Sequence, residues 1–240
     1  MSAFVDSLLA GRPLIMEVKR KSPHGEDLMA GRPVAEVVAS YAAAGASCVS
    51  VVTGRWFGGT PELLAEVAAA TTLPVLQKDF LTRRDHLHRA RDLGASAVLL
   101  TAGLLTRSSL TTLVDGALAL GLTPFVEVTT EAEVAALPLA EHCVIAVNNK
   151  DIKTGEKDAG DLGRSERMLP HVLAAGTRCP VSASGIADPA VAAHLVRTGY
   201  RGLLLGTSLL RAGNVADWVS EFDTALGRVP AAEIPVVVPG

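Results

Sequence analysis

Short apolar runs alternate with longer amphipathic segments along most of the chain. The apolar runs have the length and bounding turn residues of buried strands. They predict strands beginning at residue 14 and covering residues 48–53, 74–79, 97–101, 123–128, 144–149, 180–183 and 202–206. The segments between them predict helices at 33–44, from 60 onward, and at 83–93, 108–119, 131–137, 165–174, 189–198 and 215–226. Thr60 followed by Pro61 is typical of a helix start, and Gly45 and Gly94 follow two predicted helix ends.

The strict alternation of strands and helices predicts a parallel sheet. Eight strand–helix units, with no break that suggests a second domain, predict a single-domain (β/α)8 TIM barrel over residues 1–240. An open doubly wound α/β sheet is the alternative, but no Gly-x-Gly-x-x-Gly sequence opens the first helix. Residues 231–240 are predicted to be a loose tail.

Composition narrows the class of protein. The chain is 49% hydrophobic and 20% charged, has a formal charge of −3, and contains no apolar stretch long enough to span a bilayer. Its start lacks the features of a signal peptide, so we expect a cytoplasmic protein with no nucleic-acid or membrane partner. Cys48, Cys143 and Cys179 lie in separate apolar runs without ligand spacing, so we expect reduced core thiols and no metal site.

Polar side chains recur at the carboxyl ends of the predicted strands. Glu17 and Lys19 share one face of the first strand, where an acid and a base are costly unless they are paired or serve a site. Lys78, Glu127 and Asn148 end the third, fifth and sixth strands. Because the site of a (β/α)8 barrel lies at this end, the five side chains are predicted to share one rim. For each charge alone, a solvated strand end is the alternative.

Small residues follow the last two strands. Ser184-Gly185 and Gly206-Thr207 occupy the positions where such barrels commonly bind phosphate through backbone N–H groups. The alternative for the two glycines is ordinary turn formation.

Several blocks together resemble indole-3-glycerol-phosphate synthase. The resemblance is colinear from about Leu14 to Leu210. The blocks are Glu17-Val18-Lys19-Arg20-Lys21-Ser22-Pro23, Leu76-Gln77-Lys78-Asp79-Phe80, Val126-Glu127-Val128, Val147-Asn148-Asn149-Lys150-Asp151, Ser184-Gly185-Ile186 and Leu205-Gly206-Thr207-Ser208-Leu209. The first two blocks are the most specific, since Ser-Gly and Gly-Thr-Ser pairs also occur in other phosphate-binding barrels.

The resemblance implies ring closure of 1-(2-carboxyphenylamino)-1-deoxyribulose 5-phosphate with loss of carbon dioxide and water, as in tryptophan biosynthesis. It implies that Lys78 is the general acid and Glu127 the general base. Lys19 would bind the substrate carboxylate, and its charge could lower the pKa of Lys78. No cofactor or metal is implied, and a monomer or homodimer is expected.

The resemblance also implies the remaining substrate contacts. Glu17 and Asn148 would bind the sugar hydroxyls, and Phe80 would pack on the aryl ring. The phosphate would lie against Ser22, Ser184, Gly185, Gly206 and Thr207.

The sequence departs from the family pattern at several positions. Ala183 stands where the family usually has Glu. Gly54 stands after the second strand, where the family usually has an acidic residue, and Lys150 stands where the family usually has Arg. Thr101 replaces a usual Ile. Its hydroxyl either hydrogen-bonds a polar substituent on the aryl ring of the substrate or bonds a backbone carbonyl. Thirteen residues precede Leu14, which suggests a shortened form of the helical extension that covers the site in the family.

These departures leave three hypotheses. The first is the synthase reaction on the plain or a ring-substituted substrate. The second is a specialised-pathway paralogue with an altered substrate or outcome, such as retention of the carboxylate. The third is a non-catalytic phosphosugar-binding barrel, which the five converging polar groups disfavour.

Overall fold

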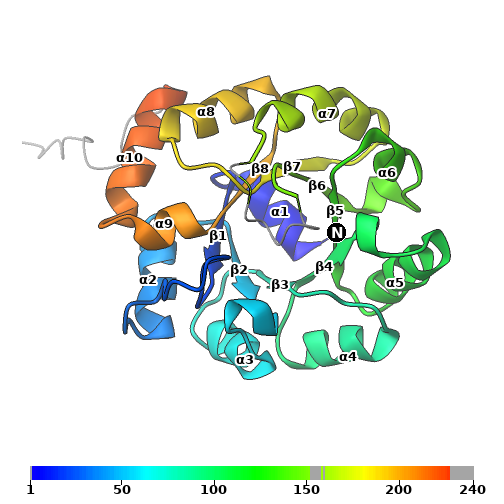
Figure 1. Cartoon of the computed structure of the whole chain (residues 1–240), viewed down its shortest axis with the longest axis horizontal. Coiled ribbons are helices and arrows are strands. Elements are labelled where there is room, and N and C mark those ends of the chain that lie inside the picture. The colour runs from blue at the N-terminus through cyan, green and yellow to red at the C-terminus, as the bar shows by residue number, and fades with distance from the viewer. Residues whose placement is uncertain (1, 152–157, 159, 228–240) are drawn as a thin grey trace, which may run out of the picture.

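Eight parallel strands close into a barrel in sequence order, as seen in the computed structural model, which describes residues 2–151, 158 and 160–227 (Figure 1). The strands are β1 (Leu14–Val18), β2 (Cys48–Val52), β3 (Val75–Lys78), β4 (Ala97–Thr101), β5 (Thr123–Val128), β6 (Val144–Asn148), β7 (Cys179–Ala183) and β8 (Gly202–Leu205). This confirms the predicted (β/α)8 barrel. The predicted tail at 231–240 lies outside the described residues.

The register of the strands decides which side chains reach the barrel interior. Side chains alternate across a strand, so Phe125 and Leu76 pack inside while their neighbours pack against the helices. In register, Thr101 pairs with Glu127 and Asn148 pairs with Ala183. All four continue the inward-facing rows at the carboxyl ends of their strands.

The helices form an outer ring around the barrel (Figure 1). They are α2 (Val34–Ala43), α3 (Pro61–Ala69), α4 (Arg84–Asp92), α5 (Arg107–Ala119), α6 (Glu131–Ala135), α7 (Gly163–Ala174), α8 (Pro189–Thr198), α9 (Thr207–Arg211) and α10 (Val215–Leu226), with short 3-10 turns at Arg55–Phe57, Ala102–Leu104 and Ala140–His142. The predicted start of α3 is confirmed, because the Thr60 side chain accepts a hydrogen bond from the Leu63 N–H and Pro61 is the first helical residue.

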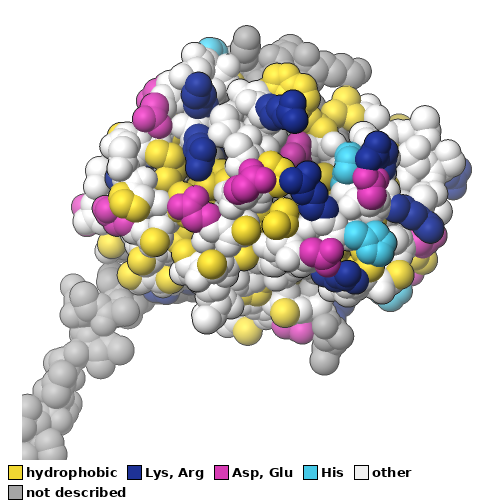
Figure 2. All heavy atoms as spheres, turned by 90° about the horizontal axis from the view of Figure 1, so that it is seen from below, with side chains coloured by type: hydrophobic (Ala, Val, Ile, Leu, Met, Phe, Trp, Pro, Cys, Tyr) yellow, Lys and Arg dark blue, Asp and Glu magenta, His cyan; other side chains and the backbone are white. Residues whose placement is uncertain are grey.

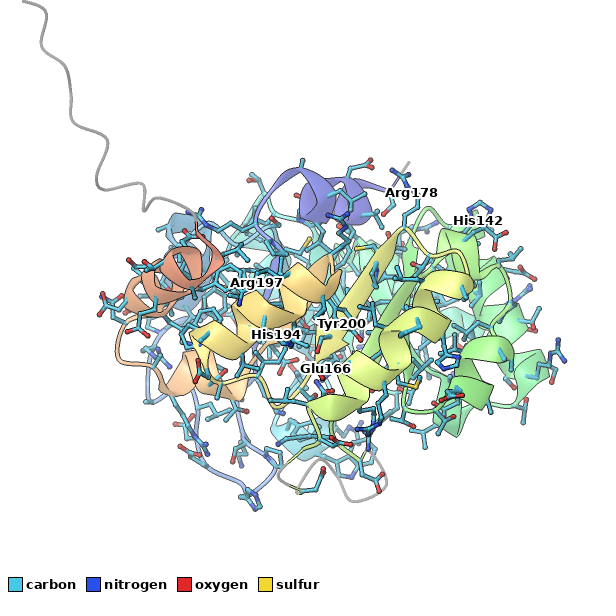
Figure 3. The ribbon with its side chains drawn as sticks, turned by 90° about the horizontal axis from the view of Figure 1, so that it is seen from above. His142, Glu166, Arg178, His194, Arg197 and Tyr200 are labelled. Atoms are coloured by element: carbon cyan, nitrogen blue, oxygen red, sulfur yellow. The ribbon has the colours of Figure 1, made fainter. Side chains whose placement is uncertain are left out.

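Side-chain contacts join neighbouring outer helices. His194 Nε2 of α8 lies 2.9 Å from Glu166 Oε1 of α7 (Figure 3), and Arg197 donates to the Ala225 carbonyl of α10. The Tyr200 hydroxyl is buried and donates to the Ser165 carbonyl at 2.7 Å, which fixes the start of α7 against the sheet.

The residues before β1 form a helix that the sequence pattern did not predict. Helix α1 (Ala3–Ala10) lies across the amino-terminal end of the barrel, at one end of the molecule in Figure 3. Phe4 meets Phe125 edge-on with ring centroids 6.2 Å apart, and Leu8 is also buried. Eight residues are too few for a stable isolated helix, so α1 depends on this burial. It therefore covers the barrel end opposite the polar rim.

The described surface mixes charges of both signs, as the side of the barrel in Figure 2 shows. Within the described ranges, no helix combines the length and apolarity that crossing a membrane requires. Cys48, Cys143 and Cys179 are free and buried, as predicted, and burial raises the pKa of the Cys143 and Cys179 thiols to about 12.

Candidate active site

The carboxyl ends of the strands surround a cavity of about 210 Å3. Eight of the predicted site residues line it: Glu17, Lys19, Lys78, Lys150, Ser184, Gly185, Gly206 and Thr207. Six further lining residues were not predicted as site residues: Pro23, Ile186, Ala187, Leu204, Ser208 and Arg211. Among the described lining residues, four are basic and one is acidic, so the cavity is suited to an anionic ligand.

A buried ion pair lies in this cavity. Lys78 Nζ is 3.6 Å from Glu17 Oε2, and the two residues are 8% and 3% exposed. Their strands are separated by β2, and the two long side chains reach each other over it on the inner face of the barrel. The Tyr41 hydroxyl donates to the Glu17 carbonyl at 2.9 Å and fixes this end of β1. The acid of the first strand is thus paired with Lys78 of the third strand at the barrel mouth.

Lys19 is positioned by an aromatic ring. Its Nζ lies 4.0 Å from the centroid of Phe57, in the 3-10 turn after β2. A cation over an aromatic face is stabilised by the electrostatics of the ring. The contact directs a buried ammonium toward the cavity that Glu17 and Lys78 share.

Gly206 leaves room for the Glu17 side chain. A Cβ at residue 206 would lie 2.4 Å from Glu17 Oε1 and 3.2 Å from its carboxyl carbon. These distances are far below van der Waals contact, so residue 206 must lack a side chain for Glu17 to keep its position. The sequence suggested only that Gly206 allows a phosphate to approach the backbone.

The turn after β7 adopts a left-handed conformation. Ser184 has φ +68° and Gly185 has φ +76°. Such a conformation is costly for a serine and must be stabilised by its surroundings. The buried Asn149 amide provides this by donating to Ser182 Oγ at 3.1 Å and to the carbonyls of Ala183 and Ser184 at 3.1 and 3.0 Å. Asn149 was quoted in a sequence block, but its positioning role was not predicted.

Glu127, Thr101 and Asn148 lie at the carboxyl ends of β5, β4 and β6 but are not among the residues that line this cavity. All three are almost fully buried on inward-facing positions. Asn148 Oδ1 accepts the Lys150 N–H at 2.9 Å. Within the described part of the chain, Asn148 Nδ2 and Thr101 Oγ1 have no hydrogen-bond partner. Ala183 is the register neighbour of Asn148, so its methyl side chain offers no acceptor to that amide.

A family model for indole-3-glycerol phosphate synthase matches residues 2–222. The chain belongs to the indole-3-glycerol phosphate synthase family. Among its relatives, the indole-3-glycerol phosphate synthase of Pyrococcus furiosus is 36% identical over 211 residues, which cover 88% of this chain and 91% of the relative. The indole-3-glycerol phosphate synthase of a Nocardioides species is 38% identical over 206 residues. These residues cover 85% of this chain and 77% of the relative. Members of this family are decarboxylating lyases, the enzyme class expected from the sequence.

A solved structure supports the fold. The crystal structure of 3-hexulose-6-phosphate synthase from Salmonella typhimurium matches with a TM-score of 0.67 and covers 89% of this chain and 98% of its own. Its sequence identity is 14%, so the similarity concerns the barrel alone.

Two further residues expected from the synthase resemblance, Ser22 and Phe80, are also absent from the cavity lining. Ser22 Oγ is buried and accepts the N–H groups of His24 and Glu26, each at 3.2 Å, within the loop after β1. Phe80 is 38% exposed and meets Trp56 edge-on, with centroids 5.7 Å apart, beside a separate groove of about 620 Å3. In this structure Ser22 shapes a loop and Phe80 forms part of an exposed aromatic pair.

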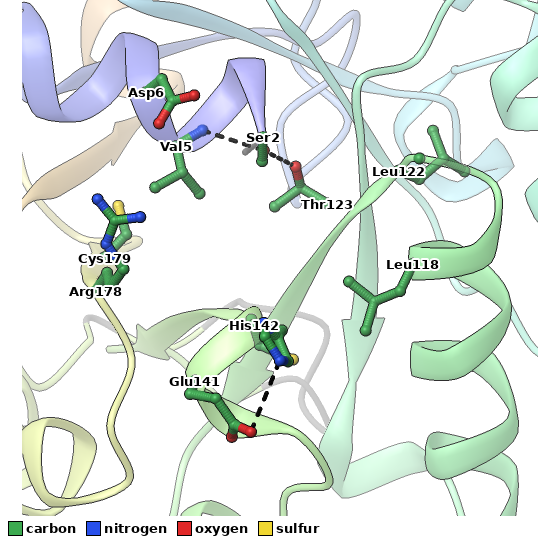
Figure 4. Close-up of a pocket in the computed structure, with 12 residues that line it drawn as sticks. Ser2, Val5, Asp6, Leu118, Leu122, Thr123, Glu141, His142, Arg178 and Cys179 are labelled. Atoms are coloured by element: carbon green, nitrogen blue, oxygen red, sulfur yellow. Dashed lines mark hydrogen bonds and ion pairs between the residues drawn. The ribbon is translucent and has the colours of Figure 1, made fainter.

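A larger cavity of about 520 Å3 lies at the opposite end of the barrel, beside α1 (Figure 4). Ser2, Arg178 and His142 contribute to its lining, and none of the predicted site residues does. The smaller cavity is therefore the candidate active site. Over the described residues, no group of three His, Cys, Asp or Glu side chains could bind a metal ion.

Proposed function

We propose that this chain catalyses the synthase reaction, closing the indole ring of 1-(2-carboxyphenylamino)-1-deoxyribulose 5-phosphate with loss of carbon dioxide and water. The observation that supports this most strongly is the buried Lys78–Glu17 pair in a cationic cavity at the carboxyl ends of the strands. An ammonium group beside a carboxylate and facing a ligand can deliver a proton repeatedly. The family relationship supplies the reaction type.

Proton transfer is assigned to Lys78 and Glu127. Lys78 protonates the ribulose carbonyl oxygen as the ring carbon that carries the carboxylate attacks the carbonyl carbon. Loss of carbon dioxide from that ring carbon then restores the aromatic ring. After the Lys78 amine has regained a proton from solvent water, it donates that proton to the departing hydroxyl, which leaves as water. Glu127 accepts a proton from the neighbouring carbon as the indole double bond forms. Glu17 orients Lys78 through the contact of 3.6 Å.

Charge complementarity supports the proposed substrate. The substrate carries a carboxylate and a phosphate, and the cavity lining carries Lys19, Lys78, Lys150 and Arg211. We assign the carboxylate to Lys19. We assign the phosphate to the turn at Ser184 and the segment from Gly206 to Ser208, because both line the cavity and a left-handed turn of this kind can present main-chain N–H groups to an anion.

Incubation with this substrate tests the proposal. We expect an indole absorbance to appear together with one carbon dioxide per product molecule. Indole absorbance without carbon dioxide would favour the paralogue that retains the carboxylate. Tight binding without any product would favour the non-catalytic phosphosugar-binding barrel.

A ring-substituted substrate is a second candidate, supported by Thr101. The hydroxyl of Thr101 is buried, inward-facing and without a hydrogen bond in the described structure. The alternative, a bond from Thr101 to a backbone carbonyl, is not made in the described structure. A buried hydroxyl without a partner is costly, and a polar substituent on the aryl ring would remove that cost.

Thr101→Val should therefore change substrate preference. We expect the ratio of kcat/KM for a hydroxyl-substituted over the plain substrate to fall about 10- to 100-fold, the effect of one buried hydrogen bond. Thr123→Val, at the opposite end of the barrel, is the matched control and should leave the ratio unchanged. An unchanged ratio in Thr101→Val would assign the plain substrate to this chain.

A further inference from the structure

Arg211 is the last residue of α9 and lines the cavity next to the segment assigned to the phosphate. Its guanidinium is bound by Glu26, in the loop between β1 and α2. Arg211 Nε lies 3.2 and 3.1 Å from the two carboxylate oxygens of Glu26, and Nη2 donates to one of them. The two side chains are 53% and 46% exposed. One cation of the cavity is therefore neutralised by a surface carboxylate of the same chain.

The position of Glu26 is set by a defined loop. The Ser22 hydroxyl accepts the Glu26 N–H at 3.2 Å, and the Ser22 N–H donates to the Glu26 carbonyl at 2.9 Å. Farther along the same loop, Arg32 Nη2 donates to the Leu210 carbonyl of α9 at 2.9 Å. The loop thus lies against α9, and the carboxylate of Glu26 is placed at the guanidinium of Arg211.

The ion pair is of a kind that exchanges partners easily. Exposed pairs are weak, because water and salt screen both charges. The hydrogen bond from Arg211 lowers the pKa of Glu26, so the carboxylate is ionised near neutral pH. A phosphate monoester carries more negative charge than a carboxylate and fits the guanidinium with two parallel hydrogen bonds.

We propose that Arg211 is a phosphate-binding residue of this site and that Glu26 competes with the phosphate for it. When a phosphorylated ligand enters, the guanidinium leaves the Glu26 carboxylate and binds the phosphate. The proposal deepens the proposed function and rests on it only for the identity of the phosphorylated substrate. The ligand chemistry itself is a phosphate monoester or inorganic phosphate.

Calorimetric titration with inorganic phosphate tests the exchange. Arg211→Gln should weaken binding about tenfold, because a charge-assisted bidentate contact is lost. Glu26→Gln should instead tighten binding by roughly threefold, because the competitor for the guanidinium is gone. The gain from Glu26→Gln should disappear in the double variant with Arg211→Gln. Arg211→Lys keeps the charge without the bidentate geometry and should be intermediate.

The double variant separates exchange from a general charge effect. If the gain persists without Arg211, Glu26 acts only as a distant negative charge and the proposal is wrong. It is also wrong if Glu26→Gln leaves the affinity unchanged or weakens it. Glu36→Gln, which removes an exposed carboxylate on α2, is the matched control and should have no effect.

Turnover measurements distinguish this proposal from the proposed function. With the phosphorylated substrate, we expect Glu26→Gln to lower KM and leave kcat unchanged. If the affinities of the variants for inorganic phosphate change as expected but no turnover occurs, the synthase assignment is refuted and the role of Arg211 is retained. Turnover with no response of KM to Glu26→Gln would refute the role of Arg211 and keep the synthase assignment.

Discussion

Lys78→Met should lower turnover by about 10²- to 10⁴-fold, the usual effect of removing one acid–base group. Methionine preserves the length and most of the volume of the side chain but cannot donate a proton. The Lys78 ammonium is buried in the cavity beside Glu17, so the substitution removes the proposed acid from the site. Steady-state kcat, followed through indole absorbance, measures the effect. Near-normal turnover would remove Lys78 from the mechanism.

Two controls separate lost chemistry from lost structure. Lys78→Met leaves the Glu17 carboxylate buried without its cation, which can cost on the order of 3 kcal/mol of unfolding free energy. The double variant Lys78→Met/Glu17→Gln removes both charges and should recover part of the melting temperature without recovering activity. Lys21→Met, an exposed lysine in the loop after β1, should leave kcat within about twofold, because surface changes away from the chemistry have small effects.

Gly206→Ala should also reduce kcat strongly, by roughly 10²-fold, because displacement of catalytic groups by about 1 Å has effects of this size. The new methyl group would lie 2.4 Å from Glu17 Oε1, so the carboxylate must move. Since Glu17 is buried and contacts Lys78 at 3.6 Å, its movement changes the position of the proposed acid. The measurement is kcat together with a crystal structure of the variant.

A second glycine provides the matched control. Gly213 follows α9, and a Cβ built there has no heavy atom within 4 Å. Gly213→Ala should therefore leave kcat unchanged. If Gly206→Ala retains full activity with an unmoved Glu17–Lys78 pair, the steric requirement at residue 206 is wrong. If it alters only KM, the glycine serves the phosphate rather than the Glu17 carboxylate.

The position of the rim residues along their strands could be read from the sequence because strand side chains alternate with a period of two. The predicted common face of Glu17 and Lys19 is confirmed by their presence in one cavity. The same reasoning placed Lys78, Glu127 and Asn148 at strand ends, where the structure has them. It could not assign the side chains beyond the strands, because loops have no such period. The substrate contacts of Ser22 and Phe80, which lie in loops, therefore rest on the synthase resemblance alone and stay predictions.

By itself the sequence determined the alternation of strands and helices, the closed barrel and the set of polar residues at one rim, since these follow from local periodicity along the chain. Only the tertiary structure decided which of those residues meet. The Glu17–Lys78 pair, the contact of Glu17 with Gly206 and the bond between Arg211 and Glu26 each join segments far apart in the sequence. The covering of the barrel bottom by α1 is of the same kind, because an eight-residue helix is stabilised by the surface it buries. Such contacts depend on barrel closure and strand register, which place distant side chains within a few ångström of one another.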